Sequence, residues 1–93
     1  MDFEWDERKS RINEELHGID FKEASKLFDG RHFVVKESPR RGEPRWIATG
    51  EYGGRLWSVV FTLRQMSVRI ISARAARKNE KERYHSSLHS RGD

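Results

Sequence analysis

The sequence contains no cysteine and no long apolar run, and these two absences exclude several classes of protein. Without cysteine there is no disulfide framework, which small secreted domains usually need, so we expect a protein of the reducing cytoplasm. No stretch approaches the roughly 20 apolar residues that cross a bilayer, and residues 1–11 lack the apolar core of a signal peptide. The sequence therefore predicts a soluble, cytoplasmic protein.

Residues that commonly build catalytic or metal sites are also scarce. No cysteine is available as a nucleophile or metal ligand, and no spacing of His, Asp and Glu resembles a zinc site. No glycine pattern matches a phosphate-binding loop before a helix. The pair His85 and His89 lies one turn apart without further nearby ligands, as is usual for solvated histidines. We therefore expect no cofactor and no metal.

The chain has 93 residues, of which 34% are hydrophobic and 37% charged. This length predicts a single compact domain, residues 1–93, that buries roughly 60–65% of the surface of its unfolded chain. Its core is therefore expected to be thin, and a binding partner can add stability.

Positive charge dominates residues 31–93 of the chain. The net charge is +4, yet residues 1–30 are net acidic and residues 31–93 are net basic. Thirteen of the nineteen cations are arginine, whose planar fork matches phosphate oxygens in pairs. The pattern favours a polyanionic partner; the alternative is an ordinary solvated surface.

Two helices are predicted near the N-terminus. The first is capped by Asp6 and runs to about His17, with Ile12 and Leu16 on its inner face and Gly18 as its end. The second follows a capping box: a carboxylate at position 20 and a glutamate three residues later. Its apolar period covers residues 21–28.

After these helices, the spacing of apolar residues changes from that of a helix to the alternation of β-strands. Four antiparallel strands are expected, over residues 32–37, 45–52, 55–64 and 68–73. A charged turn covers residues 38–44, Gly53-Gly54 signals a hairpin, and residues 65–67 form another turn. In the third strand, Trp57, Val59, Phe61 and Leu63 alternate onto one face. A last helix is expected from near Arg74 to beyond Tyr84, followed by a flexible tail, residues 86–93. The fold class is therefore α+β: two N-terminal helices, a four-stranded antiparallel sheet and a C-terminal helix.

The start of the last predicted helix is electrostatically unfavourable. Arg74, Arg77 and Lys78 fall in its first turns, where the helix dipole is already positive. A phosphate bound at the junction of sheet and helix would explain this arrangement; a solvated charged helix is the alternative. On the sheet, Thr62 and Arg64 are two residues apart in one strand and therefore point to the same face. Residues 72 and 74 likewise share a face of the next strand. These side chains are expected to line a single polar groove.

Aromatic side chains on strands can stack on bases or pack in the core. Core packing is the better explanation for Trp57 and Phe61. For Trp46, beside Arg45, core packing and a partly exposed stacking platform fit the sequence equally well.

The order of these fragments resembles that of the BrnT family of bacterial toxins along almost the whole chain. The matching fragments are Phe3-Glu4-Trp5-Asp6, Asn13 with His17-Gly18-Ile19, Phe21 with Glu23-Ala24, Phe28-Asp29, Glu43 with Arg45-Trp46, Gly50, Gly54-Arg55-Leu56, Val59-Val60, Thr62, Arg69-Ile70-Ile71-Ser72-Ala73-Arg74, Ala76, Glu80 and Tyr84. The resemblance implies a RelE-like fold and an RNA-cleaving toxin that inhibits translation, and our first hypothesis is a metal-independent endoribonuclease. The resemblance also implies a BrnA-type ribbon-helix-helix antitoxin as partner, in a complex that binds its own promoter DNA.

Residue roles follow from the chemistry that RNA cleavage needs, and for His17 the end of a helix is an equally good interpretation. We expect the catalytic candidates to be Arg64, Arg74, Arg77, His17, Glu80 and Tyr84. We expect RNA contacts from Arg45, Trp46, Arg55 and Arg69. Where this sequence has Leu16, the family commonly has a lysine, so the departure either weakens cleavage or completes the apolar face of the first helix.

Two other hypotheses remain open at this point. The protein can be a non-catalytic basic module that binds nucleic acid or an acidic protein. Alternatively, the C-terminal basic helix is chiefly the surface on which the antitoxin docks.

Overall fold

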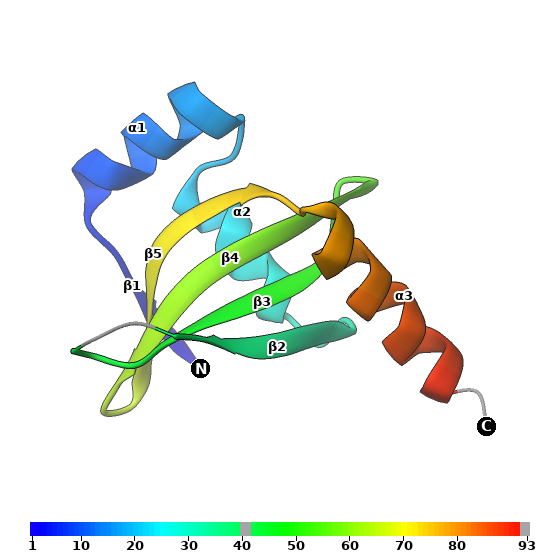
Figure 1. The fold of residues 1–93 in the computed structure, drawn as a ribbon. Helices are drawn as coiled ribbons and strands as arrows, with labels where there is room; N and C mark the ends of the chain where they lie inside the picture. Colours follow the sequence, from blue (N-terminus) through cyan, green and yellow to red (C-terminus); the bar gives the residue numbers. More distant parts are fainter. Residues whose placement is uncertain (40–41, 92–93) are drawn as a thin grey trace.

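This computed structural model describes residues 1–39 and 42–91, with side chains through residue 89. Figure 1 shows the arrangement of its helices and strands. In chain order these are β1 (Asp2–Glu4), α1 (Glu7–His17), α2 (Phe21–Ser25), the 3₁₀ turn η1 (Lys26–Phe28), β2 (Phe33–Ser38), β3 (Arg45–Tyr52), β4 (Arg55–Arg64), β5 (Ser67–Ala75) and α3 (Lys78–Arg91). The α+β class is confirmed.

The sheet has five strands in the order β1-β5-β4-β3-β2. The antiparallel meander from β2 to β5 is confirmed, whereas β1 is an additional strand that pairs with β5 in parallel. The prediction of four strands was therefore one short. A three-residue strand is too short for a recognisable alternation of side chains, and its partner lies more than sixty residues away.

The caps of the N-terminal helices are confirmed. Asp6 accepts hydrogen bonds from the backbone N–H groups of residues 8 and 9, and Gly18 ends α1 with a φ of 79°. Asp20 and Glu23 form both halves of a capping box at α2. The second helical segment ends as a 3₁₀ turn over Lys26–Phe28.

The predicted inner face of α1 was wrong. Ile12 and Leu16 are 47% and 71% exposed, whereas Ser10 and Asn13 are buried. The amide of Asn13 donates to the carbonyl of Ala73 and accepts from its N–H group. α1 therefore docks on β5 through polar side chains that complete backbone hydrogen bonds, which an apolar period cannot reveal.

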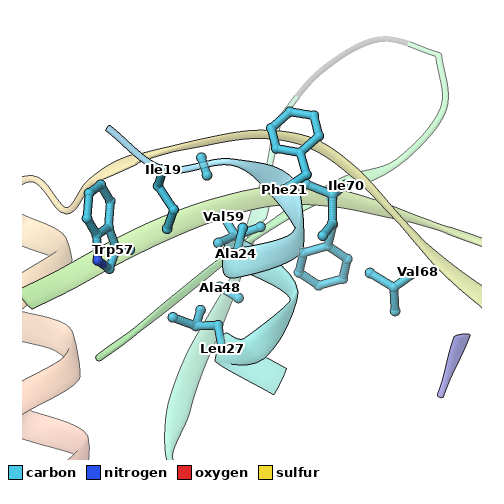
Figure 2. Close-up of a cluster of buried hydrophobic side chains, with 11 residues drawn as sticks. Ile19, Phe21, Ala24, Leu27, Ala48, Trp57, Val59, Val68 and Ile70 are labelled. Carbon is cyan, nitrogen blue, oxygen red and sulfur yellow. The ribbon is translucent and has the colours of Figure 1, made fainter. Parts of the chain in front are cut away.

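The core lies between one face of the sheet and the segment α2–η1 (Figure 2). Its central members are Ile19, Phe21, Ala24, Leu27, Ala48, Trp57, Val59, Phe61, Val68, Ile70 and Ala73. The core positions of Trp57 and Phe61 are confirmed, but Leu63, at the end of the same strand, is 55% exposed. Gly50 allows α2–η1 to approach closely, because a Cβ there would lie 3.2 Å from a side-chain atom of Leu27.

A β-bulge interrupts the pairing of β4 with β5. Val60 lies opposite Ser72 and Phe61 opposite Ile70, so Ile71 has no direct partner. An extra residue reverses the alternation of side chains beyond it. The bulge therefore has a large effect on which arginines of β5 share a face.

α3 begins at Lys78, four residues later than predicted, because β5 continues to Ala75. It also includes residues 86–91, which were expected to be a tail; residues 92–93 lie outside the described part. No glycine or proline interrupts residues 78–91, so the helical hydrogen bonds can continue. None of the helices in the described ranges is long and apolar enough to cross a membrane.

The turn expected at residues 38–44 joins β2 to β3, and residues 40–41 of it lie outside the described part. Figure 1 shows α3 at the end of the sheet where β3 turns into β4. The hairpin between β4 and β5 lies at the other end, near β1.

Candidate functional site

One face of the sheet, here called the polar face, carries Ser58, Val60, Thr62 and Arg64 of β4, opposite in orientation to the core residues Val59 and Phe61. Thr62 lies opposite Arg69, and Ser58 lies opposite Arg74, so both arginines of β5 share this face. Simple alternation would separate residues 69 and 74; the bulge at Ile71 brings them together.

Arg64 and Arg74 share the polar face but lie at opposite ends of it. Arg64 pairs with Ser67 and Arg74 with Ser58, so six residues of β4 separate the two positions. At about 3.3 Å per residue this is roughly 20 Å. The two arginines therefore do not meet in the single polar groove that was predicted.

At the α3 end, the Glu80 carboxylate is the centre of a buried network. The Arg74 guanidinium donates to both of its oxygens, over 2.8 and 2.9 Å. The Ser58 hydroxyl and the backbone N–H of Arg77 each donate to Oε1 over 2.8 Å. Thr49 extends the network through a 2.7 Å hydrogen bond to Ser58. The side chains of Glu80 and Arg74 are 5% and 19% exposed.

This network explains Arg74 and the favourable start of α3, whereas the side chains of Arg77 and Lys78 are exposed. Glu80 lies in the first turn of the helix, where a negative charge is favourable, and reaches back to the N–H of Arg77 as in a capping box. Arg74 belongs to β5 and is neutralised by Glu80. The anion expected at the junction of sheet and helix is thus supplied by the protein itself.

The same contacts decide the charge of Glu80. Hydrogen bonds from Arg74 above all, and from Arg77 and Ser58, outweigh the effect of burial and lower the pKa of Glu80 from 4.5 to about 2. A carboxylate with such a low pKa is a weak base near neutral pH. Glu80 is therefore better suited to hold Arg74 and α3 in place than to transfer protons.

Acid is expected to destabilise the fold through Glu80. Its folded-state pKa is depressed, so its contribution is present above about pH 4.5 and is lost as the pH falls towards 2. The shift corresponds to roughly 3 kcal/mol. Urea unfolding between pH 6 and pH 2.5 should show this loss in the native protein and a smaller one in Glu80→Gln. If the free energy of unfolding depended equally on pH in the two proteins, this role of Glu80 would be contradicted.

Beside α3 lies a groove formed by two cavities of about 360 and 350 Å³ that share four lining residues. The residues of this α3 groove used below are Arg55, Leu56, Lys81, Tyr84 and His85. The ring of Tyr84 lies 5.5 Å from that of His85, and the guanidinium of Arg55 lies 4.8 Å above the ring of Trp57. The groove thus combines two cations with the exposed imidazole of His85 and with Tyr84, which is 8% exposed.

Sequence reasoning missed two residues of this groove. Lys81 and His85 are one turn apart on α3, which places them on one face of the helix. His85 had been interpreted as a solvated histidine. The signal was present in the i, i+4 spacing, but the length of the helix and its position beside Arg55 were needed to use it.

Two other predicted site residues lie apart from this groove. His17 is exposed in the last turn of α1, and no hydrogen bond, ion pair or ring contact among the described residues joins it to Arg74 or Glu80. Trp46 lies on the core side of the sheet, with its ring 6.1 Å from that of Phe61. A stacking platform at Trp46 is therefore not supported.

At the other end of the polar face lies a cavity of about 210 Å³, here called the arginine pocket. Its cations are Lys9, Arg45, Arg64 and Arg69. Three of them were predicted site residues, and the structure brings these three together; Lys9, from α1, was missed. No periodic pattern in the sequence connects the start of α1 to this end of the sheet.

One group of carboxylates could hold a metal ion. Within the described residues, Glu14, Asp20 and Glu23 place one oxygen each within 4.8 Å of one another. Asp20 and Glu23 already accept hydrogen bonds as the capping box of α2, and the group lies in neither the α3 groove nor the arginine pocket. Helix capping thus explains Asp20 and Glu23, and Glu14 is an exposed carboxylate of α1.

The sequence matches a protein-family model described as "Ribonuclease toxin, BrnT, of type II toxin-antitoxin system" over residues 5–80. The match begins before α1 and ends in the first turn of α3, so it includes Arg55, Arg74 and Glu80. No curated protein matches the chain.

Proposed function

Because the chain belongs to the BrnT family of ribonuclease toxins of type II toxin–antitoxin systems, we propose that it is an endoribonuclease that cleaves RNA in the α3 groove and thereby inhibits translation. The observation that carries the location is the meeting of Arg55, Lys81 and His85 in one groove. The Arg74–Glu80 pair holds α3 against β4 and β5 beside it.

The groove offers the groups that RNA cleavage requires. The 2′-hydroxyl attacks the adjacent phosphorus, so a proton leaves that oxygen and another reaches the departing 5′-oxygen. Arg55 and Lys81 stabilise the charge on the phosphoryl oxygens, supported by the exposed Arg77 at the start of the helix. His85 and Tyr84 transfer the protons, because arginine remains protonated and cannot act as a base.

The proposed reaction needs no metal ion. The cations of the groove supply the charge stabilisation for which other nucleases use a metal. Cleavage should therefore persist in a chelator, which distinguishes this route from a metal-assisted one.

Membership of a type II family implies a cognate antitoxin. We assign to it, as part of the proposal, a BrnA-type ribbon-helix-helix protein of the cytoplasm, in a complex that binds its own promoter DNA. The support is the family and the basic surface of the toxin.

The proposal predicts that His85→Gln lowers the rate of RNA cleavage at least 100-fold, since general acid–base groups typically contribute that much. His89→Gln is the matched control, an exposed histidine one turn further along α3, and should cleave normally. Purified proteins would be incubated with labelled RNA, with and without EDTA.

Cleavage that disappears in EDTA would contradict metal independence. Intact RNA with folded wild-type protein that still binds RNA would favour the non-catalytic module. In that case Leu16→Lys is the first reversion to test, because Leu16 is 71% exposed and so does not complete an apolar face.

A further inference from the structure

The fold gathers four cations at the end of the sheet that lies away from α3. Lys9, Arg45, Arg64 and Arg69 of the arginine pocket come from α1, β3, β4 and β5. The cavity of about 210 Å³ is several times the ~30 Å³ that a water molecule occupies in the liquid. It therefore has room for a phosphate group.

The acidic residues of the pocket do not neutralise it. Its lining holds four cations and two carboxylates, Asp6 and Glu43, and Glu4 pairs with Arg69 beside it, which leaves a formal charge of +1. Asp6 caps α1, and Glu43 accepts two hydrogen bonds from Arg64. Among the described residues, the side chains of Lys9 and Arg45 have no hydrogen bond or ion pair. Two cations thus remain available to an anion.

The other two cations are held in place. Arg64 is bound by Glu43 over 2.9 and 3.1 Å, and Arg69 donates to Glu4 over 2.8 Å. Glu4 also accepts from the hydroxyl of Ser67 over 2.6 Å. Fixed guanidinium groups lose less conformational freedom when they meet a phosphate, which favours binding.

We propose that the arginine pocket binds a backbone phosphate of the RNA, as a subsite separate from the α3 groove. This inference rests on the proposed function, because it takes RNA as the ligand. Leu56 of the groove and Thr62 of the pocket are six residues apart on β4, or about 20 Å. A single strand that occupies both sites has several nucleotides between them, so the pocket contributes to binding and not to bond breaking.

The test is the double variant Lys9→Ala/Arg45→Ala, which removes the two cations without a structural partner. Arg11→Ala/Lys22→Ala is the control, with the same loss of charge at exposed positions of α1 and α2. The probe is a labelled 2′-O-methyl RNA of about 12 nucleotides, within the usual range of single-strand sites. Kd would be measured at several salt concentrations, and circular dichroism would confirm that each variant is folded.

We expect the pocket variant to bind the probe about tenfold more weakly than the control. The slope of log binding constant against log salt concentration should be smaller by about 0.7 for each lost phosphate contact. On cleavable RNA its KM should rise while kcat stays unchanged. A dinucleotide, too short to span both sites, should be cleaved equally by both variants. Equal Kd values for the two variants would overturn the proposal, as would a loss of antitoxin affinity with unchanged RNA binding.

The outcomes separate this proposal from the proposed catalytic site. If the wild type cleaves nothing but the pocket variant loses RNA affinity, the pocket stands and the catalytic proposal fails. If the wild type cleaves and the pocket variant binds as the control does, only the pocket fails.

Discussion

Glu80→Ala is expected to lower the free energy of unfolding by about 3–5 kcal/mol, since it leaves the charge of Arg74 buried without its partner. The side chain of Arg74 is 19% exposed, and both of its terminal nitrogens donate to Glu80. The variant also removes the acceptor for the N–H of Arg77 and the hydroxyl of Ser58. Small domains have total stabilities of about 5–15 kcal/mol, so much of the fold's stability depends on this carboxylate. Urea unfolding at pH 7 measures the change.

Glu82→Ala is the matched control, because Glu82 is exposed on the same helix two residues away. Its free energy of unfolding should change by less than about 0.5 kcal/mol. Arg74→Ala/Glu80→Ala should be less destabilised than the sum of the two single variants, since the double variant leaves no buried charge. Additive effects would show that the ion pair does not couple the two residues.

Asn13→Ala is expected to cost about 3 kcal/mol, because it leaves several buried backbone groups without a partner. Its amide donates to the carbonyls of Ile19 and Ala73 over 2.8 and 2.9 Å and accepts from the N–H of Ala73 over 3.2 Å. These bonds attach α1 to β5 next to Arg74. Unfolding in urea, with hydrogen exchange of the Ala73 amide, would measure the effect.

Glu15→Ala, at an exposed position of α1, controls for helix propensity and should leave the Ala73 amide protected. Asn13→Asp is a sharper variant, since it can still accept from Ala73 but cannot donate to the two carbonyls. It should be at least as unstable as Asn13→Ala at neutral pH. Native stability in Asn13→Asp would contradict the proposed attachment of α1.

Local features of the fold could be predicted because neighbouring residues determine them. The carboxylates of Asp6 and Asp20 bind backbone groups two or three residues away. The hairpin at Gly53-Gly54 depends on glycines with positive φ, at 62° and 82°. The family also could be recognised, since fragments in a fixed order extend over most of the chain. The chemistry expected of the protein, basic side chains that act on RNA, followed from the same information.

The candidate site could be predicted only in part. Arg45, Arg64 and Arg69 were identified as site residues, and the structure places them in one pocket. The separation of Arg64 from Arg74 was already implied by the predicted turn at residues 65–67, which places Arg64 beside the turn and Arg74 at the far end of the hairpin. The bulge at Ile71, which decides the face that each arginine of β5 shares, could not be seen. The exposed side of α3 was missed, since its apolar content is too low to define a face.

The sequence by itself determined the caps, the period of each main element, the excess of arginine and the family. The tertiary structure alone decided that Glu80 neutralises Arg74, that the bulge at Ile71 places Arg69 and Arg74 on one face, and that Lys9 joins the arginine pocket. The physical reason is the range of the interactions. Caps and turns form within a few residues, whereas ion pairs, register and cavities arise only when distant segments pack together.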